Sequence, residues 1–242
     1  MKTSLFITIV LVSGAFAGFI HGTVNFVIVE PYLDQAIGIE NQNLFASGEE
    51  DTPEFWVEYE GYRIWQKSGQ IVAGVILGMS VGSLFGIVFA LSRNALPGNN
   101  VIKKAVILSG IMWFTLYIIP FLKYPANPPT VGDGETVVLR AILYLSFITI
   151  SGLGAIAFYK LSKKFQNKKK LVALISYTVF ISAVFFAMPE NPDKITAPMN
   201  LVNEFRIMSV LGVTSFWASM GLILGFFWNR FESHKETTPH YT

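Results

Sequence analysis

The feature that most constrains this chain is a set of six long apolar stretches without any Asp, Glu, Lys or Arg. They cover approximately residues 3–29, 68–92, 105–122, 141–159, 171–189 and 207–229. A helix needs about 20 mainly apolar residues to cross the roughly 30 Å of hydrocarbon in a bilayer. Charged residues make up only 14% of the chain, against about 25% in soluble domains. The sequence therefore predicts an all-α, polytopic protein of the cell membrane, with residues 1–242 forming a single bundle of six spans.

The positions of Lys and Arg predict how these spans are oriented, because cytoplasmic segments are enriched in both residues. Basic residues gather in segments 93–104 and 160–170, and Lys2, Arg230 and Lys235 lie near the two termini. The other three connections hold 14 of the 16 carboxylates. We therefore expect both termini in the cytoplasm and the three acidic connections outside.

The first span has a competing interpretation. Lys2, a short apolar core and Ala15-Phe16-Ala17 together resemble a cleavable signal peptide. The apolar run continues to Val29, however, which is longer than a usual signal core. We therefore expect this segment to be retained as a membrane helix.

Glycines recur at every fourth position in three of the predicted spans, which places them on one face of each helix. They are Gly14, Gly18 and Gly22 in the first span, Gly74, Gly78, Gly82 and Gly86 in the second, and Gly221 and Gly225 in the last. Small residues let membrane helices approach closely. We expect these faces to hold the three spans together; a sliding face or a seam for a partner helix is the functional alternative.

The first connection, residues 30–67, is predicted to be an acidic external loop. Nine carboxylates against Arg63 and Lys67 give it a net charge of about −7, a field that concentrates cations. Glu30 follows the first span and Asp34 lies one helical turn further, so the two could share a divalent cation. The alternative is a solvated loop that only maintains orientation and solubility.

Few polar side chains lie within the predicted spans, and His21 and Asn25 are the most notable. A histidine at membrane depth is a functional candidate, and imidazole suits cobalt, nickel or zinc. A single histidine is not a metal site, however, so hydrogen bonding between helices explains His21 at least as well.

Residues 120–136 form a proline-rich external loop. Four prolines fall within ten residues, and proline cannot continue a helix, so we expect a stiff connector. Asp133 or Thr136 can cap the next helix, and Glu135 suits its first turn. A role as connector alone is the alternative to a charged cluster on the outer face. That cluster would consist of Lys123, Asp133, Glu135 and Arg140.

A resemblance to the hallmark of the probable cobalt transporter subunit family, CbtA type, is carried by the run Pro120-Phe121-Leu122-Lys123-Tyr124-Pro125-Ala126-Asn127-Pro128-Pro129-Thr130-Val131-Gly132-Asp133-Gly134-Glu135-Thr136-Val137. The segment Glu30–Asp34 resembles that family's first motif, and the last span, entered by Glu204-Phe205-Arg206, is similar as well. The resemblance implies a membrane subunit of a cobalt uptake system tied to cobalamin supply. It also implies a small, histidine-bearing membrane partner of the CbtB type and five spans, one fewer than we predict.

Cation transport, with divalent cobalt as cargo, is the leading hypothesis. Glu30, Asp34, Asp133 and Glu135 would then offer ligands near the mouth, and His21 and Asn25 would mark the path inward. The alternative is a non-transporting accessory or assembly subunit of a membrane complex. No nucleophile–base pair or metal motif lies at membrane depth, and the sequence has no metalloprotease or dinucleotide motif, so we expect neither an enzyme nor a bound cofactor. We expect the lysines of 160–170 to meet anionic membrane lipid rather than nucleic acid.

Overall fold

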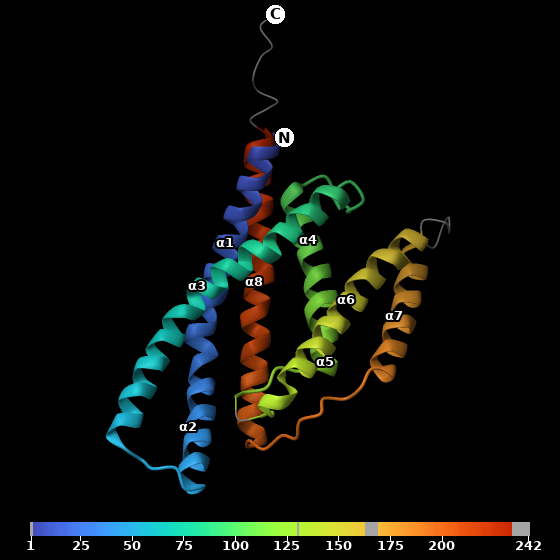
Figure 1. Cartoon of the computed structure of the whole chain (residues 1–242). Helices are drawn as coiled ribbons and strands as arrows, with labels where there is room; N and C mark the ends of the chain where they lie inside the picture. Colours follow the sequence, from blue (N-terminus) through green and yellow to red (C-terminus); the bar gives the residue numbers. More distant parts are fainter. Residues whose placement is uncertain (1, 130, 163–168, 234–242) are drawn as a thin grey trace, which may run out of the picture.

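The computed structural model describes residues 2–129, 131–162 and 169–233, and these ranges contain helices but no β-strand (Figure 1). In chain order the elements are α1 (Thr3–Ile28), α2 (Glu30–Ala46), α3 (Pro53–Ser92), α4 (Val101–Trp113), the π-helix η1 (Phe114–Ile118), α5 (Ile119–Lys123), the 3₁₀-helix η2 (Gly134–Thr136), α6 (Val137–Ser162), α7 (Lys169–Ala187) and α8 (Met199–Ser233).

Among the residues that the structure describes, five helical segments are long and apolar enough to cross a membrane: Thr3–Ile28, Pro53–Ser92, Val101–Lys123, Gly134–Leu161 and Met199–Phe231. The predicted class, an all-α polytopic membrane protein, is confirmed. The sixth apolar stretch, 171–189, ends as a helix at Ala187, and its apolar helical part, Leu171–Ala187, is shorter than the other five. Six spans therefore remain a prediction.

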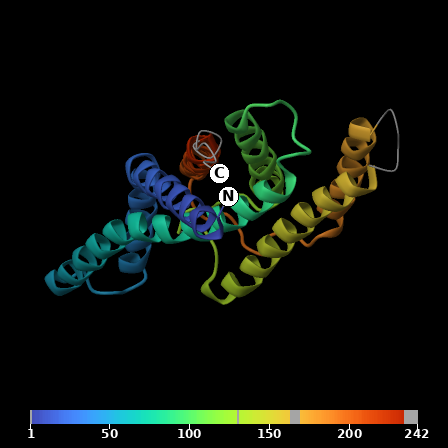
Figure 2. The same ribbon diagram turned by 90° about the horizontal axis from the view of Figure 1, so that it is seen from above.

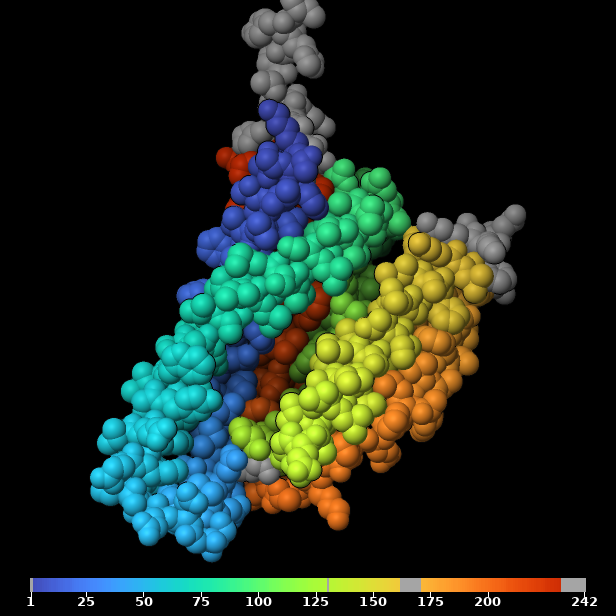
Figure 3. Space-filling model, in the orientation of Figure 1, coloured from blue at the N-terminus to red at the C-terminus, as the bar shows by residue number. Residues whose placement is uncertain are grey.

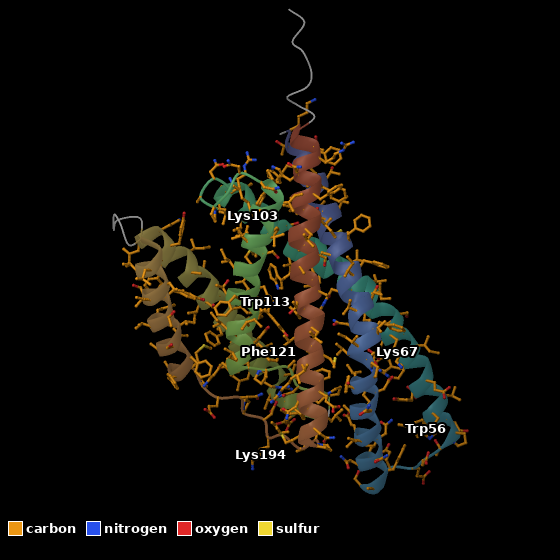
Figure 4. All side chains as sticks on the ribbon, turned by 180° about the vertical axis from the view of Figure 1, so that it is seen from behind. Trp56, Lys67, Lys103, Trp113, Phe121 and Lys194 are labelled. Atoms are coloured by element: carbon orange, nitrogen blue, oxygen red, sulfur yellow. The ribbon has the colours of Figure 1, made fainter. Side chains whose placement is uncertain are left out.

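The connections alternate between the two ends of the molecule as the charge pattern predicts. The start of α1, the α3–α4 connection and the end of α8 lie at one end, and the α2–α3 turn and the α7–α8 connection lie at the other (Figure 1). Figure 4 shows Lys103 toward the first end and Trp56 and Lys194 toward the second. We call the second end the acidic end; its location outside the cell remains a prediction.

Segment 30–67 is helical over most of its length, so its description as a loop is corrected. Pro31 lies in the first turn of α2, where its missing N–H costs nothing. The side chain of Thr52 caps α3 by accepting a hydrogen bond from the amide of Phe55 at 3.3 Å, and Pro53 follows. Gly48, with φ of +112°, occupies the turn between them. Helix α2 and the part of α3 before residue 68 lack the apolar run by which the membrane helices were recognised.

Helices α1, α3, α8 and α4 pack side by side into one body, with α1 against α3 and α8, and α8 against α4. Helices α6 and α7 form a hairpin that projects from this body, as the view from above shows (Figure 2). The hairpin is attached mainly through η1 and α5. The space-filling view shows a hollow between α3 and α6, with α8 and α4 at its floor (Figure 3).

Glycines make the contact between α1 and α3 very close. A Cβ atom on Gly78 would lie 2.6 Å from the Cα of Gly18, and one on Gly82 would lie 2.8 Å from the Cα of Gly14. The predicted glycine faces of these two helices therefore do meet. The two glycines of α8 contact a different partner than expected: a Cβ on Gly225 would lie 2.8 Å from the Cα of Ile102, in α4. Helix α8 does pack along α1, but Gly221 and Gly225 face α4.

The π-helix η1 interrupts the third apolar span just before Pro120. Proline has no N–H to donate to the preceding turn, so the backbone there is free to widen. The carbonyl of Thr115 accepts a hydrogen bond from the hydroxyl of Ser151 at 2.5 Å, and that hydroxyl also bonds Tyr177 at 2.6 Å. The widened turn thus joins α4 to the α6–α7 hairpin.

Candidate functional site

His21 lies at membrane depth and bonds two groups at once. Its Nδ1 lies 2.8 Å from the carbonyl oxygen of Gly212 in α8, and its Nε2 lies 3.1 Å from the Nδ2 of Asn25. A carbonyl can only accept and an amide nitrogen can only donate, so Nδ1 carries the proton and Nε2 is the acceptor. His21 therefore joins α1 to α8 and has no free ring nitrogen for a metal ion in this arrangement.

Glu30 and Asp34 lie together, as their spacing predicts, and both face α3. Arg63 donates to the carboxylates of Glu30 and, at 2.7 Å, Asp34. Lys67 bonds the second oxygen of Asp34 at 2.7 Å, and Gln70 bonds the second oxygen of Glu30 at 3.0 Å. Each of the four carboxylate oxygens thus receives a donor from α3, and the two acids are balanced by two bases. We call these five residues the carboxylate cluster.

Sequence reasoning missed the bases of the carboxylate cluster, although a signal was present. Arg63 and Lys67 are spaced by four residues, as Glu30 and Asp34 are. Residues four apart share a helix face, so two facing helices of this pattern can pair in register. The pairing depends on segment 30–67 folding as a helical hairpin, which the sequence analysis did not predict.

The carboxylate cluster lies at the base of the α2–α3 hairpin, where Arg63 and Glu30 are buried, being 6% and 8% exposed. Partial burial alone would raise the pKa of the Asp34 carboxyl. Hydrogen bonds and charge from Lys67 and Arg63 outweigh that effect and hold the pKa below its ordinary value. Asp34 therefore stays ionised under ordinary conditions.

The predicted charged cluster of Lys123, Asp133, Glu135 and Arg140 does not form as expected. Asp133 caps η2 by accepting from the amide of Glu135 at 2.9 Å, as predicted for its capping role. The side chain of Glu135 is exposed. The Nζ of Lys123 lies 4.0 Å from the Oε1 of Glu190 and 5.1 Å from the ring centre of Phe185. The expected partners were wrong because the α7–α8 connection supplies the acids.

Asp193 is the residue of this region that sequence reasoning missed. Its carboxylate forms an ion pair with the Nε of Arg140 at 2.7 Å and accepts a hydrogen bond from the hydroxyl of Thr136 at 2.7 Å. Its side chain is only 3% exposed. The sequence shows Asp193 in the third acidic connection, but nothing in it shows that this connection folds back onto Arg140.

Helix α8 also holds the proline-rich connector. Arg206 donates to the carbonyl of Ala126 at 3.2 Å and to the Oδ1 of Asn127 at 2.7 Å. The hydroxyl of Tyr124 donates to the carbonyl of Pro189 at 2.6 Å. The motif residues of the connector and of α8 are thus in direct contact.

A cavity of about 340 Å³ lies between this connector and α6. Its polar lining consists of Tyr117, Tyr124, Asn127, Arg140, Tyr144 and Asn191. Tyr117 comes from the π-helix, and Asn191 comes from the α7–α8 connection. We call this space the connector cavity.

The predicted metal ligands are distributed over separate places. Glu30 and Asp34 lie in the carboxylate cluster, His21 lies between α1 and α8, and Asp133 and Glu135 lie at the start of α6. Within the described ranges no three His, Asp or Glu side chains gather closely enough to hold a metal ion. A metal-binding role for these residues remains a prediction.

Comparison with known proteins gives one family. The family model described as probable cobalt transporter subunit (CbtA) matches residues 3–229, nearly the whole chain. No curated protein and no solved structure matches.

Proposed function

Because the chain belongs to the CbtA family of probable cobalt transporter subunits, we propose that it is the membrane-spanning subunit of a cobalt uptake system and acts with a second membrane protein. The observation that carries this proposal is the family match over residues 3–229 of a chain with five helices able to cross a membrane. The family description names a subunit of a transporter, which supports a role other than catalysis.

The acidic end of the molecule supports uptake of a cation. The far part of the α2–α3 hairpin carries exposed carboxylates that raise the local concentration of cations. They are Glu40, Glu49, Glu50, Asp51, Glu54, Glu58 and Glu60. In this proposal the hairpin collects hydrated cobalt at the mouth of the transporter.

The next step in the proposal is binding at Glu30 and Asp34. Arg63 and Lys67 already balance these acids, so a divalent ion would have to replace them as the counter-charge. Carboxylates alone make a weak site for cobalt, which also accepts imidazole. A small, histidine-bearing partner of the CbtB type would supply the missing ligands.

A second candidate function is favoured by the same contacts. The carboxylate cluster is neutral, and the glycines of α1 and α3 touch backbone to backbone. Both features suit an accessory subunit that assembles a complex without moving the ion. The two functions differ in their dependence on cobalt: a transporter subunit must bind or move the ion, whereas an assembly subunit acts without it.

Uptake of radioactive cobalt, nickel and zinc by cells that lack their own importers tests the proposal. The chain is expressed alone, with the small partner, and as the Glu30→Gln plus Asp34→Asn variant. Glu190→Gln is the control, since this carboxylate is 94% exposed and lies outside the α2–α3 hairpin. We expect cobalt uptake that requires the partner, falls at least tenfold (about 1.4 kcal/mol) in the double variant and persists in the control. Correctly inserted protein without metal-dependent uptake in any combination favours the accessory subunit.

A further inference from the structure

Two side-chain amides that line the connector cavity, those of Asn127 and Asn191, have donors available. Arg206 has only donors, so the atom of Asn127 that it contacts is the amide oxygen. The Oδ1 of Asn191 likewise accepts from the backbone amide of Asp193 at 3.1 Å. Both amide oxygens are therefore occupied. Among the described residues nothing accepts from the Nδ2 groups of either side chain, which remain able to donate.

Arg140 adds a charged donor to this lining. Its Nε pairs with Asp193, and one Nη2 hydrogen goes to the carbonyl of Asp133 at 3.0 Å. Within the part of the chain that the structure describes, Nη1 has no acceptor. Guanidinium groups bind phosphate and carboxylate oxygens especially well, because their donors lie in a planar fork.

Tyr117 is a largely buried residue among those that line the connector cavity. The residue is 9% exposed, and its hydroxyl has no hydrogen-bond partner among the described residues. A buried hydroxyl without a partner is costly, so native proteins rarely leave one without a role. Its position in a π-helix strengthens the case, since such widened turns occur often at functional sites.

The charges around the connector cavity also favour an anion. No Asp or Glu is among the residues that line it. The carboxylate of Asp193, just behind Arg140, uses both oxygens on Arg140 and Thr136. Arg206 lies behind Asn127 and contacts two neutral oxygens there. These contacts do not neutralise the positive charge of Arg206, which therefore favours an anion in the connector cavity.

We propose that the connector cavity binds a phosphate group, held by Arg140, the amide nitrogens of Asn127 and Asn191, and the hydroxyl of Tyr117. The donors come from four separate segments, α6, the connector, the α7–α8 connection and η1, which suits a tetrahedral oxyanion with several acceptor oxygens. The phosphate comes either from the headgroup of an anionic phospholipid or from free inorganic phosphate. This site is independent of the proposed cobalt transport, and its test involves no cobalt.

The test uses the full chain, purified in detergent and stripped of lipid. Binding of radioactive inorganic phosphate is measured by equilibrium dialysis, and binding of phosphatidylglycerol by native mass spectrometry. Tyr117→Phe removes one hydroxyl and keeps the ring. Asn127→Asp keeps an acceptor for Arg206 but replaces the donating amide by a negative charge. Tyr177→Phe is the matched control, because Tyr177 is a buried tyrosine that bonds Ser151 and does not line the connector cavity.

We expect Tyr117→Phe to weaken binding about tenfold, as for loss of one hydrogen bond to a charged group. Asn127→Asp should weaken it further, and Tyr177→Phe should bind as the unmodified chain does. Binding of inorganic phosphate identifies a free anion as the ligand, and binding of phosphatidylglycerol alone identifies a lipid headgroup. The proposal is overturned if the unmodified chain binds neither, or if it and a folded Asn127→Asp variant bind equally.

Discussion

Arg63 is the residue on which the base of the α2–α3 hairpin depends most. It is buried and holds both Glu30 and Asp34. Removing one partner of a buried ion pair leaves an uncompensated charge and costs about 3 kcal/mol or more. We expect Arg63→Ala to lower the free energy of unfolding in detergent by about that amount. Lys67→Ala should cost less than about 1 kcal/mol, because Lys67 and Asp34 are 32% and 42% exposed. Equal losses in the two variants would contradict this account.

Asp34 should make the stability of the hairpin depend on pH in the acid range. Its pKa lies below the ordinary value of 3.8, so its contribution is complete above that value. The contribution is lost as pH falls through the lower pKa of the folded state, where the carboxylate gains a proton. The unmodified chain should therefore melt at a higher temperature than Asp34→Asn at pH 6, and the difference should shrink below pH 3.8. A difference that is constant down to pH 2 would show that the charge of Asp34 stabilises nothing.

Helices α1 and α3 should tolerate no side chain at their closest approach. A methyl group on Gly78 would meet the backbone of Gly18, which cannot move aside as a flexible side chain can. We expect Gly78→Ala to destabilise the protein by about 1–3 kcal/mol through overpacking. Gly61 lies on the same helix with nothing within 4 Å of an added Cβ. Gly61→Ala should leave stability unchanged or raise it by up to about 1 kcal/mol. Unfolding of both variants in detergent checks this, and a Gly78→Ala variant as stable as the original would refute the close contact.

The elements differ in how far the sequence could predict them. Apolar runs predict the membrane helices well, because burial in lipid requires both length and the absence of charge. Four-residue spacing located the glycine faces, but it carries no information on the partner, so Gly221 was expected to contact the wrong helix. Helix α2 has no apolar run, so segment 30–67 was predicted to be a loop, although Pro31 suits the first turn of α2 and Thr52 suits the N-cap of α3.

The candidate sites were harder to predict because they depend on contacts between distant segments. The spacing of Glu30 and Asp34 correctly placed them together, but their neutralisation by α3 follows from the register of a hairpin. The same holds for Arg140 and Asp193, which are brought together by the path of the α7–α8 connection. The spacing of residues within one helix can be read from the local sequence, whereas the pairing of residues on different helices depends on how the whole chain folds.

At the scale of the whole molecule, the predicted orientation and the sixth span can be tested directly. The chain contains no cysteine, so each introduced cysteine is the only one present. We expect a membrane-impermeant maleimide added outside intact cells to label Glu49→Cys and Glu190→Cys, but not Asn99→Cys or Lys160→Cys. This pattern follows if both termini are cytoplasmic and α7 crosses the membrane. Labelling of Lys160→Cys from outside would place the α6–α7 hairpin differently.

The central claim is that this chain, as a subunit, allows cobalt to cross a membrane. The most direct measurement is the flux of radioactive cobalt into sealed lipid vesicles containing the purified chain, alone or with its small partner. We predict saturable cobalt entry with both proteins present, and loss of entry when Glu30→Gln and Asp34→Asn are combined. Vesicles with both proteins correctly inserted, but no more permeable to cobalt than empty ones under any imposed ion or voltage gradient, would contradict the claim.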